Sequence, residues 1–363
     1  MKLLCFIDSL GAGGAQRQLV TLAIEFAKRG YDVEFLLYEH KDFYLSTLQD
    51  NNIKVNYIIE ENFIKRIFKV RRFIRKGKYD IVLSFLVRAT FMAELASLPC
   101  RRWKLFVGER SSDPRIVNLW KTRIIRWLHI FADKVISNSN TNVELVRQAC
   151  PLLPKSKFAV IYNAVDINKF VCNLDYDFKH NGKIRIVVPA SYRYLKNLSG
   201  LIEALRLIDV DLRNKLIIDW YGHNLLDDSK SHDQEKINEY GLQDTIILHD
   251  AINNIEDEMA HADFIGLFSL IEGFPNAVCE GMLLGKPILC SSVSDVPMIV
   301  ENGVNGLVCD PKDPQSIANV LIKALALSVE EMKQMGIKNR EKAESLFAKD
   351  VNVDNYITIF NEK

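Results

Sequence analysis

Several familiar signatures are missing from this 363-residue sequence. No apolar run approaches the length of about 20 residues that a transmembrane helix needs. The seven cysteines form no Cys-x-x-Cys pair and none stands with histidine at metal-ligand spacing, which indicates reduced thiols and no zinc site. Neither His-Glu-x-x-His nor Gly-x-Ser-x-Gly occurs, so a metalloprotease or a hydrolase triad has no support. The first eight residues turn acidic too soon for a signal peptide, so we expect a cytoplasmic protein.

The charged residues divide the chain into two halves of opposite sign. Residues 1–165 carry 27 Lys and Arg against 15 Asp and Glu, a net charge of +12. Residues 166–363 carry 20 against 31, a net charge of −11, so the whole chain is left at +1. Such an asymmetry predicts two domains with different partners.

The positive charge of the first half gathers in two stretches. Residues 63–79 hold eight Lys and Arg and no acid, interleaved at helical spacing with Phe and Ile, and residues 101–126 are again basic and aromatic. A basic amphipathic helix suits an anionic membrane, so we predict peripheral contact with the inner face of the plasma membrane through residues 63–78 and, as a second candidate, 101–126. Helices packed on their own sheet, with solvated cations outside, remain the alternative. Nucleic acid is not expected, because no nucleic-acid-binding motif is present.

Strand and helix patterns alternate along the chain, which predicts an α/β protein built from doubly wound parallel sheets. The predicted strands of the first half are residues 2–8, 32–37, 53–58, 80–84, 104–108 and 133–137. The pattern breaks at residues 161–170, and a second series follows at 184–189, 216–221, 245–248, 264–268 and 287–291. We therefore predict domains at residues 1–165 and 166–345, with a last helix within 346–363.

Two acids eight residues apart mark a loop of the second half. Glu272 follows the predicted strand 264–268, and Glu280 lies in a helix that Pro275 opens and Gly285 ends. Backbone amides at the start of a helix attract anions such as phosphate, and we expect such donors at Phe274, Asn276 and Ala277. Two carboxylates with amides between them suit a ligand that carries hydroxyls and phosphates, such as a nucleotide sugar.

The run Glu272-Gly-Phe-Pro-Asn276, the later Glu280, Gly285-Lys-Pro287 and residues 300–308 together resemble the Glu-x7-Glu signature of retaining glycosyltransferases of family four. That family has the GT-B fold, in which two Rossmann-like domains face a central cleft. The resemblance implies an N-terminal acceptor domain, a C-terminal nucleotide-sugar domain and a last helix that crosses back. It also implies that Glu272 faces the donor sugar and Glu280 holds the ribose. The remaining donor-binding residues that we predict in this domain are Gly222, Gly273, Phe274, Pro275, Asn276 and Ala277.

A glycine loop, Gly11-Ala-Gly13-Gly14-Ala-Gln16, follows the first strand and opens a helix. Glycines there let the backbone approach a diphosphate. The loop resembles the family's own, which implies that Gly13, Gly14 and Gln16 face the donor phosphates. An NAD fingerprint is the alternative, supported by Glu39 near the end of the second strand, although Gln16 occupies the third glycine position. A purely structural turn also remains open.

Cations for the diphosphate are expected in Ser191-Tyr-Arg193-Tyr-Leu-Lys196. The family places an arginine five residues before its lysine, and with Lys196 in register that position holds Ser191. Arg193 is the nearest cation. We predict Lys196 and Arg193 as catalytic residues and Ser191 as a substrate contact, with a surface salt bridge as the alternative for Arg193.

The N-terminal domain departs from the family at one further point. Many members carry a histidine after a central strand, but here the strand 104–107 leads into Gly108-Glu109-Arg110-Ser-Ser. We predict that Glu109 takes the catalytic place and that Arg110 contacts substrate. Ser112 and Asp113 are expected to cap the helix at Pro114.

These observations predict a retaining hexosyltransferase that moves a sugar from a nucleotide donor, UDP-linked by our expectation, to a glycan acceptor. The resemblance to enzymes of surface-polysaccharide assembly implies a polyprenyl-diphosphate-linked acceptor. No metal or other cofactor is expected, because cations and amides can neutralise the diphosphate. The alternatives are a nucleotide-sugar epimerase on the same architecture, or a non-catalytic membrane-binding module.

Overall fold

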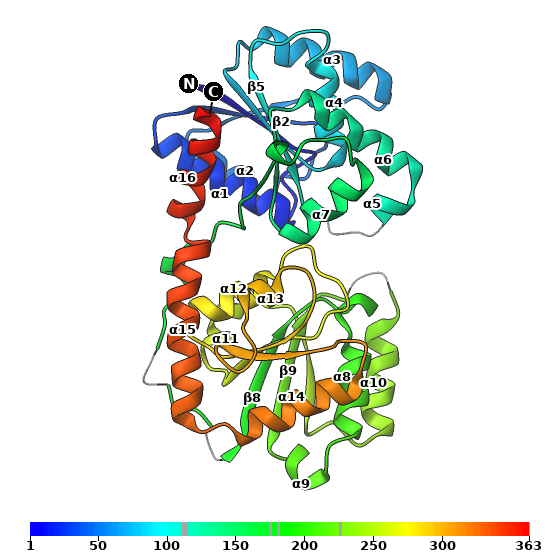
Figure 1. Cartoon of the computed structure of the whole chain (residues 1–363), viewed down its shortest axis with the longest axis vertical. Helices are drawn as coiled ribbons and strands as arrows, with labels where there is room; N and C mark the ends of the chain where they lie inside the picture. Colours follow the sequence, from blue (N-terminus) through cyan, green and yellow to red (C-terminus); the bar gives the residue numbers. More distant parts are fainter. Residues whose placement is uncertain (111–114, 174–175, 180–181, 225–226, 363) are drawn as a thin grey trace. The chain divides into compact units, whose positions relative to one another are not determined.

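The computed structural model describes residues 1–110, 115–173, 176–179, 182–224 and 227–362 (Figure 1). It divides into two compact units, one of residues 1–164 and 349–363 and the other of residues 165–348. The divisions that we predicted from the sequence, after residues 165 and 345, lie within three residues of these. The helix start predicted at Pro114, with its caps Ser112 and Asp113, lies outside the described residues.

Unit 1 is built on a parallel sheet of seven strands in the order β3-β2-β1-β4-β5-β6-β7. Its strands are β1 Lys2–Phe6, β2 Asp32–Leu37, β3 Lys54–Tyr57, β4 Ile81–Phe85, β5 Lys104–Glu109, β6 Lys134–Ser137 and β7 Phe158–Val160. Its helices are α1 Gly14–Lys28, α2 Leu45–Asp50, α3 Phe63–Lys76, α4 Val87–Ala96, α5 Arg115–Asn118, α6 Trp120–Trp127, η1 Leu128–Phe131, α7 Asn140–Ala149 and α16 Lys349–Asn361.

Both faces of this sheet are covered, because successive residues of its strands point to opposite cores. On one face Leu3 and Cys5 of β1 pack with α1 and α16, and Phe26 of α1 meets Phe360 of α16 at 5.4 Å between ring centroids. On the other face Leu4 and Phe6 pack with α3 and α4. The near-continuous apolar strands of the sequence follow from this double burial.

Unit 2 has a parallel sheet of six strands in the order β10-β9-β8-β11-β12-β13. Its strands are β8 Ile184–Pro189, β9 Leu216–Gly222, β10 Ile246–Asp250, β11 Phe264–Leu267, β12 Ile288–Ser291 and β13 Gly306–Cys309. Its helices are α8 Leu198–Arg206, α9 Val210–Arg213, α10 Ser229–Glu239, α11 Ile255–Ala260, α12 Asn276–Leu283, α13 Val296–Ile299, α14 Pro314–Ala326 and α15 Val329–Phe347.

The predicted fold class is confirmed by these two parallel α/β sheets, with corrections at the sheet edges. Two strands, β7 and β13, were absent from the prediction, because three- or four-residue strands carry little periodic signal. Strand β10 continues to Asp250, where the prediction stopped at residue 248. His249 and Asp250 are polar, yet they remain in register with Tyr221 and Gly222 of β9.

Candidate functional site

One of the two acids predicted for the donor site, Glu272, and the predicted cation, Lys196, come together in unit 2. Lys196 Nζ lies 2.5 Å from Glu272 Oε1, and Ser269 Oγ donates to the same oxygen at 2.6 Å. The side chain of Glu272 is 10% exposed and that of Lys196 25%, so the pair is partly screened from water but open to a ligand. The two charges of this ion pair offset each other, so an anionic ligand gains the lysine charge only when Lys196 turns from Glu272 toward it.

Neighbouring strands bring these side chains together. Strands β8 and β11 are paired and parallel, so the loops after their carboxyl ends meet at one edge of the sheet. The loop after β8 forms the 3₁₀ turn η5, Tyr194–Lys196, and the Leu270 amide donates to the Leu195 carbonyl at 2.9 Å. This backbone bond fixes the Lys196 loop to the Glu272 loop.

Asn197 is a positioning residue that our sequence analysis missed. Its backbone is left-handed, with φ of 65°, and its buried amide donates to the carbonyls of Phe268 at 3.0 Å and Pro311 at 2.8 Å. Asparagine tolerates this conformation better than most residues. A single asparagine after a predicted strand is too weak a sequence signal to assign this role.

The helix that carries Glu280 begins one residue later than predicted. Pro275 is the N-cap of α12 and lies outside its first turn, and Gly285 ends the helix with a φ of 69°. One expectation about the amides is wrong: the Asn276 amide donates to the Phe274 carbonyl at 3.0 Å, so it is not an unpaired donor. The carbonyl of Gly273, in turn, accepts from Ser294 Oγ at 3.4 Å. Glu280 is partly buried in the second turn of α12, and Ala277 is buried in its first.

Gly222 has a packing role that the sequence did not reveal. A Cβ at this position would lie 2.1 Å from the Ala190 carbonyl oxygen, so any side chain would force β8 and β9 apart at their ends. The same carbonyl accepts from Trp220 Nε1 at 2.7 Å. The close approach supports the backbone that presents Ser191, and the donor contacts predicted for Gly222 and Ser191 stay predictions.

Arg193 is the exposed residue that opens η5, and its carbonyl accepts from the Lys196 amide at 2.8 Å. The pKa of Asp227 is lowered chiefly by its hydrogen bond from Ser229, with a smaller contribution from Arg193. The charge of Arg193 thus acts weakly on Asp227, whereas Lys196 forms an ion pair with Glu272.

The glycine loop of unit 1 opens α1 as predicted from its position. Gly13 is the N-cap of α1, its amide donates to the Gly11 carbonyl at 2.8 Å, and the helix starts at Gly14. Gln16 Nε2 donates to Asp8 Oδ1 at 3.0 Å, which ties the first turn of α1 to the end of β1. The roles of Gly13, Gly14 and Gln16 toward phosphate stay predictions.

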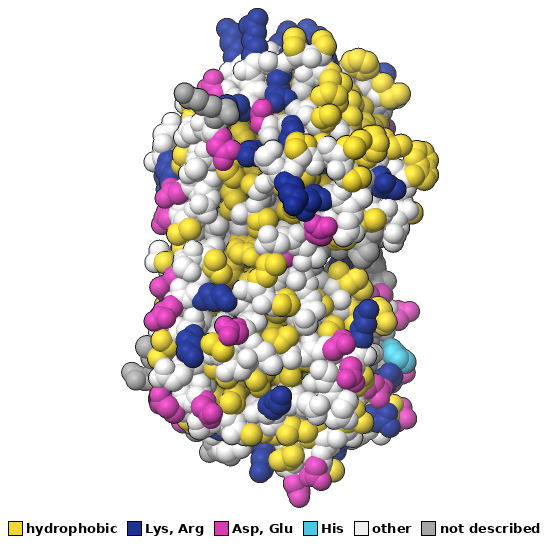
Figure 2. All heavy atoms as spheres, in the orientation of Figure 1, with side chains coloured by type: hydrophobic (Ala, Val, Ile, Leu, Met, Phe, Trp, Pro, Cys, Tyr) yellow, Lys and Arg dark blue, Asp and Glu magenta, His cyan; other side chains and the backbone are white. Residues whose placement is uncertain are grey.

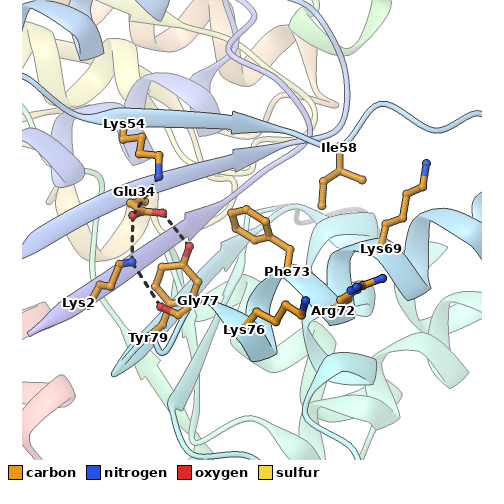
Figure 3. A pocket seen from close by; sticks show the side chains of 10 residues that line it. All are labelled: Lys2, Glu34, Lys54, Ile58, Lys69, Arg72, Phe73, Lys76, Gly77 and Tyr79. Carbon is orange, nitrogen blue, oxygen red and sulfur yellow. Dashed lines mark hydrogen bonds and ion pairs between the residues drawn. The ribbon is translucent and has the colours of Figure 1, made fainter.

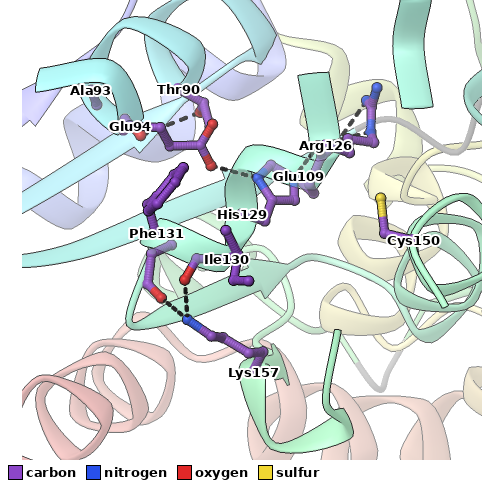
Figure 4. Close-up of polar contacts among 12 residues, drawn as sticks. Thr90, Ala93, Glu94, Glu109, Arg126, His129, Ile130, Phe131, Cys150 and Lys157 are labelled. Atoms are coloured by element: carbon purple, nitrogen blue, oxygen red, sulfur yellow. Dashed lines mark hydrogen bonds and ion pairs between the residues drawn. The ribbon is translucent and has the colours of Figure 1, made fainter. Parts of the chain in front are cut away.

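Glu109 lies in a buried ionic cluster that also contains Glu94, Arg126 and His129 (Figure 4). Arg126 donates to Glu109 Oε2 at 3.1 Å, and His129 bridges Glu94 Oε1 at 2.6 Å and Glu109 Oε1 at 3.1 Å. Glu109, for which we predicted a catalytic role, is thus already bound by two side chains of unit 1. Its catalytic role remains a prediction, and its structural role is now evident. The sequence signal was present: Glu94 is the single acid in an apolar helical segment.

The cluster shifts the pKa values of its members. Burial alone would lower the pKa of His129, but Glu94 and Glu109 outweigh it and raise that pKa to about 9. Burial would raise the pKa of Glu109, yet the bonds from His129 and Arg126 lower it overall. For Glu94 burial dominates, and its pKa is raised. The two acids and two cations of the cluster offset one another, which lowers the free-energy cost of burying their charges.

Arg110, the other residue predicted in this segment, is also held within unit 1. Its guanidinium lies 4.1 Å from the Phe85 ring centroid, donates to Asn163 Oδ1 at 3.2 Å and donates to Tyr356 Oη. These contacts connect the residue after β5 to Asn163, near the end of residues 1–164, and to α16. A substrate contact by Arg110 stays a prediction.

The structure agrees with known glycosyltransferases over its full length. Anabaena HepE, solved in complex with UDP, superposes with a TM-score of 0.86 and 20% identity over 99% of both chains. This likeness, together with the paired acid and lysine at the strand ends, shows that the protein has the GT-B fold.

Two sequence families divide the chain between them. The family described as "Glycosyl transferases group 1" matches residues 176–342, and "Glycosyltransferase Family 4" matches residues 12–169. The chain belongs to the family-four-like glycosyltransferases of the GT-B fold.

Curated relatives match most of the chain. The N-acetylgalactosamine-N,N'-diacetylbacillosaminyl-diphospho-undecaprenol 4-alpha-N-acetylgalactosaminyltransferase of Campylobacter jejuni is 27% identical over 80% of each chain. The UDP-Gal:alpha-D-GlcNAc-diphosphoundecaprenol alpha-1,3-galactosyltransferase of Escherichia coli is 26% identical over 72% of this chain and 70% of its own. Within the described residues, every helix is too short or too polar to cross a bilayer.

Proposed function

We propose that the protein transfers a hexose from a UDP-sugar to a glycan carried on polyprenyl diphosphate, with retention of configuration, in bacterial surface-polysaccharide synthesis. The ion pair of Lys196 and Glu272 at the carboxyl ends of β8 and β11 carries this proposal. The names of the two relatives, both of which specify diphospho-undecaprenol acceptors, support the acceptor class. HepE, crystallised with UDP, supports the nucleotide.

In this proposal the lysine neutralises charge on the departing diphosphate. Electrostatic stabilisation of developing charge is the main task in breaking the sugar–phosphate bond. Lys196 supplies the cation, Glu272 and the Gly273–Phe274 backbone orient the sugar, and Glu280 accepts the ribose hydroxyls. The proposal invokes no metal, because it assigns the neutralisation of the diphosphate to Lys196 and to backbone amides.

Glu280 gives a direct test of donor binding. Glu280→Gln should weaken UDP binding by about 1–3 kcal/mol, because a carboxylate accepts stronger hydrogen bonds from ribose hydroxyls than an amide does. Calorimetric titration with UDP measures the change, and Glu301→Gln, an exposed acid of the same unit, is the matched control. Unchanged UDP affinity in a folded Glu280→Gln protein would contradict the assignment.

A lipid-linked acceptor requires contact with the membrane, and α3 of unit 1 provides a basic face for it. Lys69, Arg72 and Lys76 line one side of a cavity of about 480 Å³ (Figure 3). The single acid in its lining, Glu34, is already held by Lys2 at 3.0 Å and by Tyr79 Oη at 2.8 Å. The cavity therefore presents excess positive charge, which favours lipid phosphates.

The structure also shows which α3 cations can be tested without damaging the fold. Arg71 and Arg75 donate to backbone carbonyls at the end of α4, including Leu95 at 2.9 Å and Ala96 at 3.1 Å, so both stabilise unit 1. Lys65, Arg72 and Lys76 are exposed on α3 and suit the experiment better.

Replacing Lys65, Arg72 and Lys76 together by Gln should weaken binding to anionic vesicles roughly 100-fold, at about 1 kcal/mol for each cation near the surface. Flotation at low and high salt measures this, since salt screens the attraction. The matched control replaces three exposed lysines of unit 2, Lys312, Lys323 and Lys338, by Gln. If both triple variants float like the wild type, α3 is not the contact.

A further inference from the structure

Helix α6 and the adjoining turn η1 present an apolar stripe that the fold leaves uncovered. Trp120, Ile124, Trp127 and Ile130 are 66%, 57%, 52% and 59% exposed, and their spacing of four, three and three residues places them on one side. We call these four residues the tryptophan face. Figure 2 shows hydrophobic side chains gathered over α3 and α6 of unit 1. Single exposed apolar residues are ordinary, but such a stripe marks an interaction site.

The opposite side of the same segment fixes this orientation. Arg126 and His129 are 2% and 1% exposed and belong to the buried cluster with Glu94 and Glu109. Turning the tryptophans inward would pull both cations out of that cluster and leave two buried acids without partners. Stranding a buried charge is costly, so the tryptophan face stays outward.

The charge around the face selects the partner. The sequence has no Asp or Glu between Asp113 and Asp133, and Lys121 and Arg123 are exposed beside the tryptophans. Lys121 Nζ lies 5.6 Å from the Trp120 ring centroid. Tryptophan with adjacent cations is the side-chain combination that settles at a membrane interface, where indoles lie at headgroup level and cations meet lipid phosphates.

The face also continues a second exposed apolar surface. Helix α4 packs against both α3 and η1, so these segments lie on one side of the unit 1 sheet. Phe63, Ile64 and Phe68 of α3 are 41%, 65% and 66% exposed. Both exposed apolar surfaces therefore belong to the same side of unit 1.

We propose that the tryptophan face inserts into an anionic lipid bilayer, with the rings of Trp120 and Trp127 among the headgroups and upper acyl chains. Helix α3 then contributes mainly electrostatic attraction, and the α6–η1 segment contributes apolar burial that salt does not screen. This inference rests on the proposed membrane-bound acceptor and names the surface that anchors the enzyme to it.

The four tryptophans of the chain allow a direct test. Trp103 and Trp220 are 7% and 0% exposed, so their emission should not respond to lipid. Adding vesicles of equal phosphatidylglycerol and phosphatidylcholine should shift the emission to the blue, and brominated lipid should quench it. Trp120→Phe with Trp127→Phe should abolish both signals and keep flotation, because phenylalanine preserves the apolar face.

Polar variants complete the test. Trp120→Gln with Trp127→Gln should reduce vesicle partitioning at high salt at least 10-fold, and Ile124→Gln with Ile130→Gln gives an independent pair should the first fail to fold. UDP affinity, measured in parallel, should be unchanged, which separates this inference from the donor site. Flotation without a blue shift or quenching would overturn insertion. So would polar variants that partition like wild type, or a wild-type dimer that the polar variants dissociate, since the face would then join two copies.

Discussion

Lys196→Ala should lower kcat by about 100- to 1,000-fold, the loss seen when one preorganised group that stabilises transition-state charge is removed. The side chain lies 2.5 Å from Glu272, on the loop fixed to it by the Leu270–Leu195 backbone bond. The expected loss is in kcat more than in KM, since the charge on the diphosphate grows as the bond to the sugar breaks. Release of nucleoside diphosphate from a panel of UDP-sugars, with a lipid-linked acceptor present, measures it.

Arg193→Ala is the matched control for that experiment. Arg193 is exposed and acts only weakly on Asp227, so its removal should change kcat by less than about 10-fold, as expected for a surface charge. A larger loss at Arg193 than at Lys196 would mean that Arg193 holds the diphosphate and that Lys196 mainly supports Glu272. Equal losses would assign the diphosphate to both cations.

Lys196 and Glu272 should also behave as one unit. Each single change leaves the partner without its counter-ion, whereas the double change Lys196→Met with Glu272→Gln removes both charges. The losses should therefore be strongly non-additive in a double-mutant cycle. Additive losses would show that the ion pair itself contributes little and that each side chain acts on the donor independently.

The sequence carried more information about the donor half than about the rest. Glu272, Glu280 and Lys196 were predicted because their loops or helices follow buried strands and because their spacing resembles the family's motifs. The contacts that set the geometry were not predictable. Asn197 acts through hydrogen bonds to carbonyls 71 and 114 positions away along the chain. Ser269 acts through a hydrogen bond to Glu272, three residues later. Neither kind of contact leaves a periodic pattern in the sequence.

Glu109 shows the reverse difficulty. Its position after a central strand indicated a site residue, but the partners that occupy its carboxylate lie 17 and 20 residues later, on α6 and η1. The lone acid Glu94 in an apolar helical segment, with the cation Arg126 further along the chain, could have indicated a buried ionic cluster. Which acid meets which cation depends on how α4, β5 and α6 pack, and spacing along one element does not encode that.

Arg126→Met should lower the free energy of unfolding by about 3–5 kcal/mol, the cost of removing one partner from a buried ion pair. Glu109 would keep only His129, and Glu94 would share the same imidazole. Urea denaturation followed by circular dichroism measures the loss. Lys121→Met, which removes an exposed cation of the same helix, is the matched control and should cost less than about 1 kcal/mol. A loss of activity at Glu109→Gln without loss of stability would instead return Glu109 to a catalytic role.

The same cluster predicts how stability depends on pH. The pKa of His129 is about 9 in the folded protein and near 6.5 when unfolded, so the protonated imidazole stabilises the fold fully below pH 6.5. That contribution is lost as the pH rises through 9. The lowered pKa of Glu109 matters at acidic pH. Its contribution to stability is lost as the pH falls and the carboxylate is protonated in the folded protein. The raised pKa of Glu94 has the opposite effect and reduces stability once the carboxylate ionises.

The free energy of unfolding should therefore fall between pH 7 and 9, and this fall should be absent in His129→Gln. A wild-type protein equally stable at pH 7 and 9 would show that His129 is neutral in the cluster, and Arg126 would then be its only cation at neutral pH.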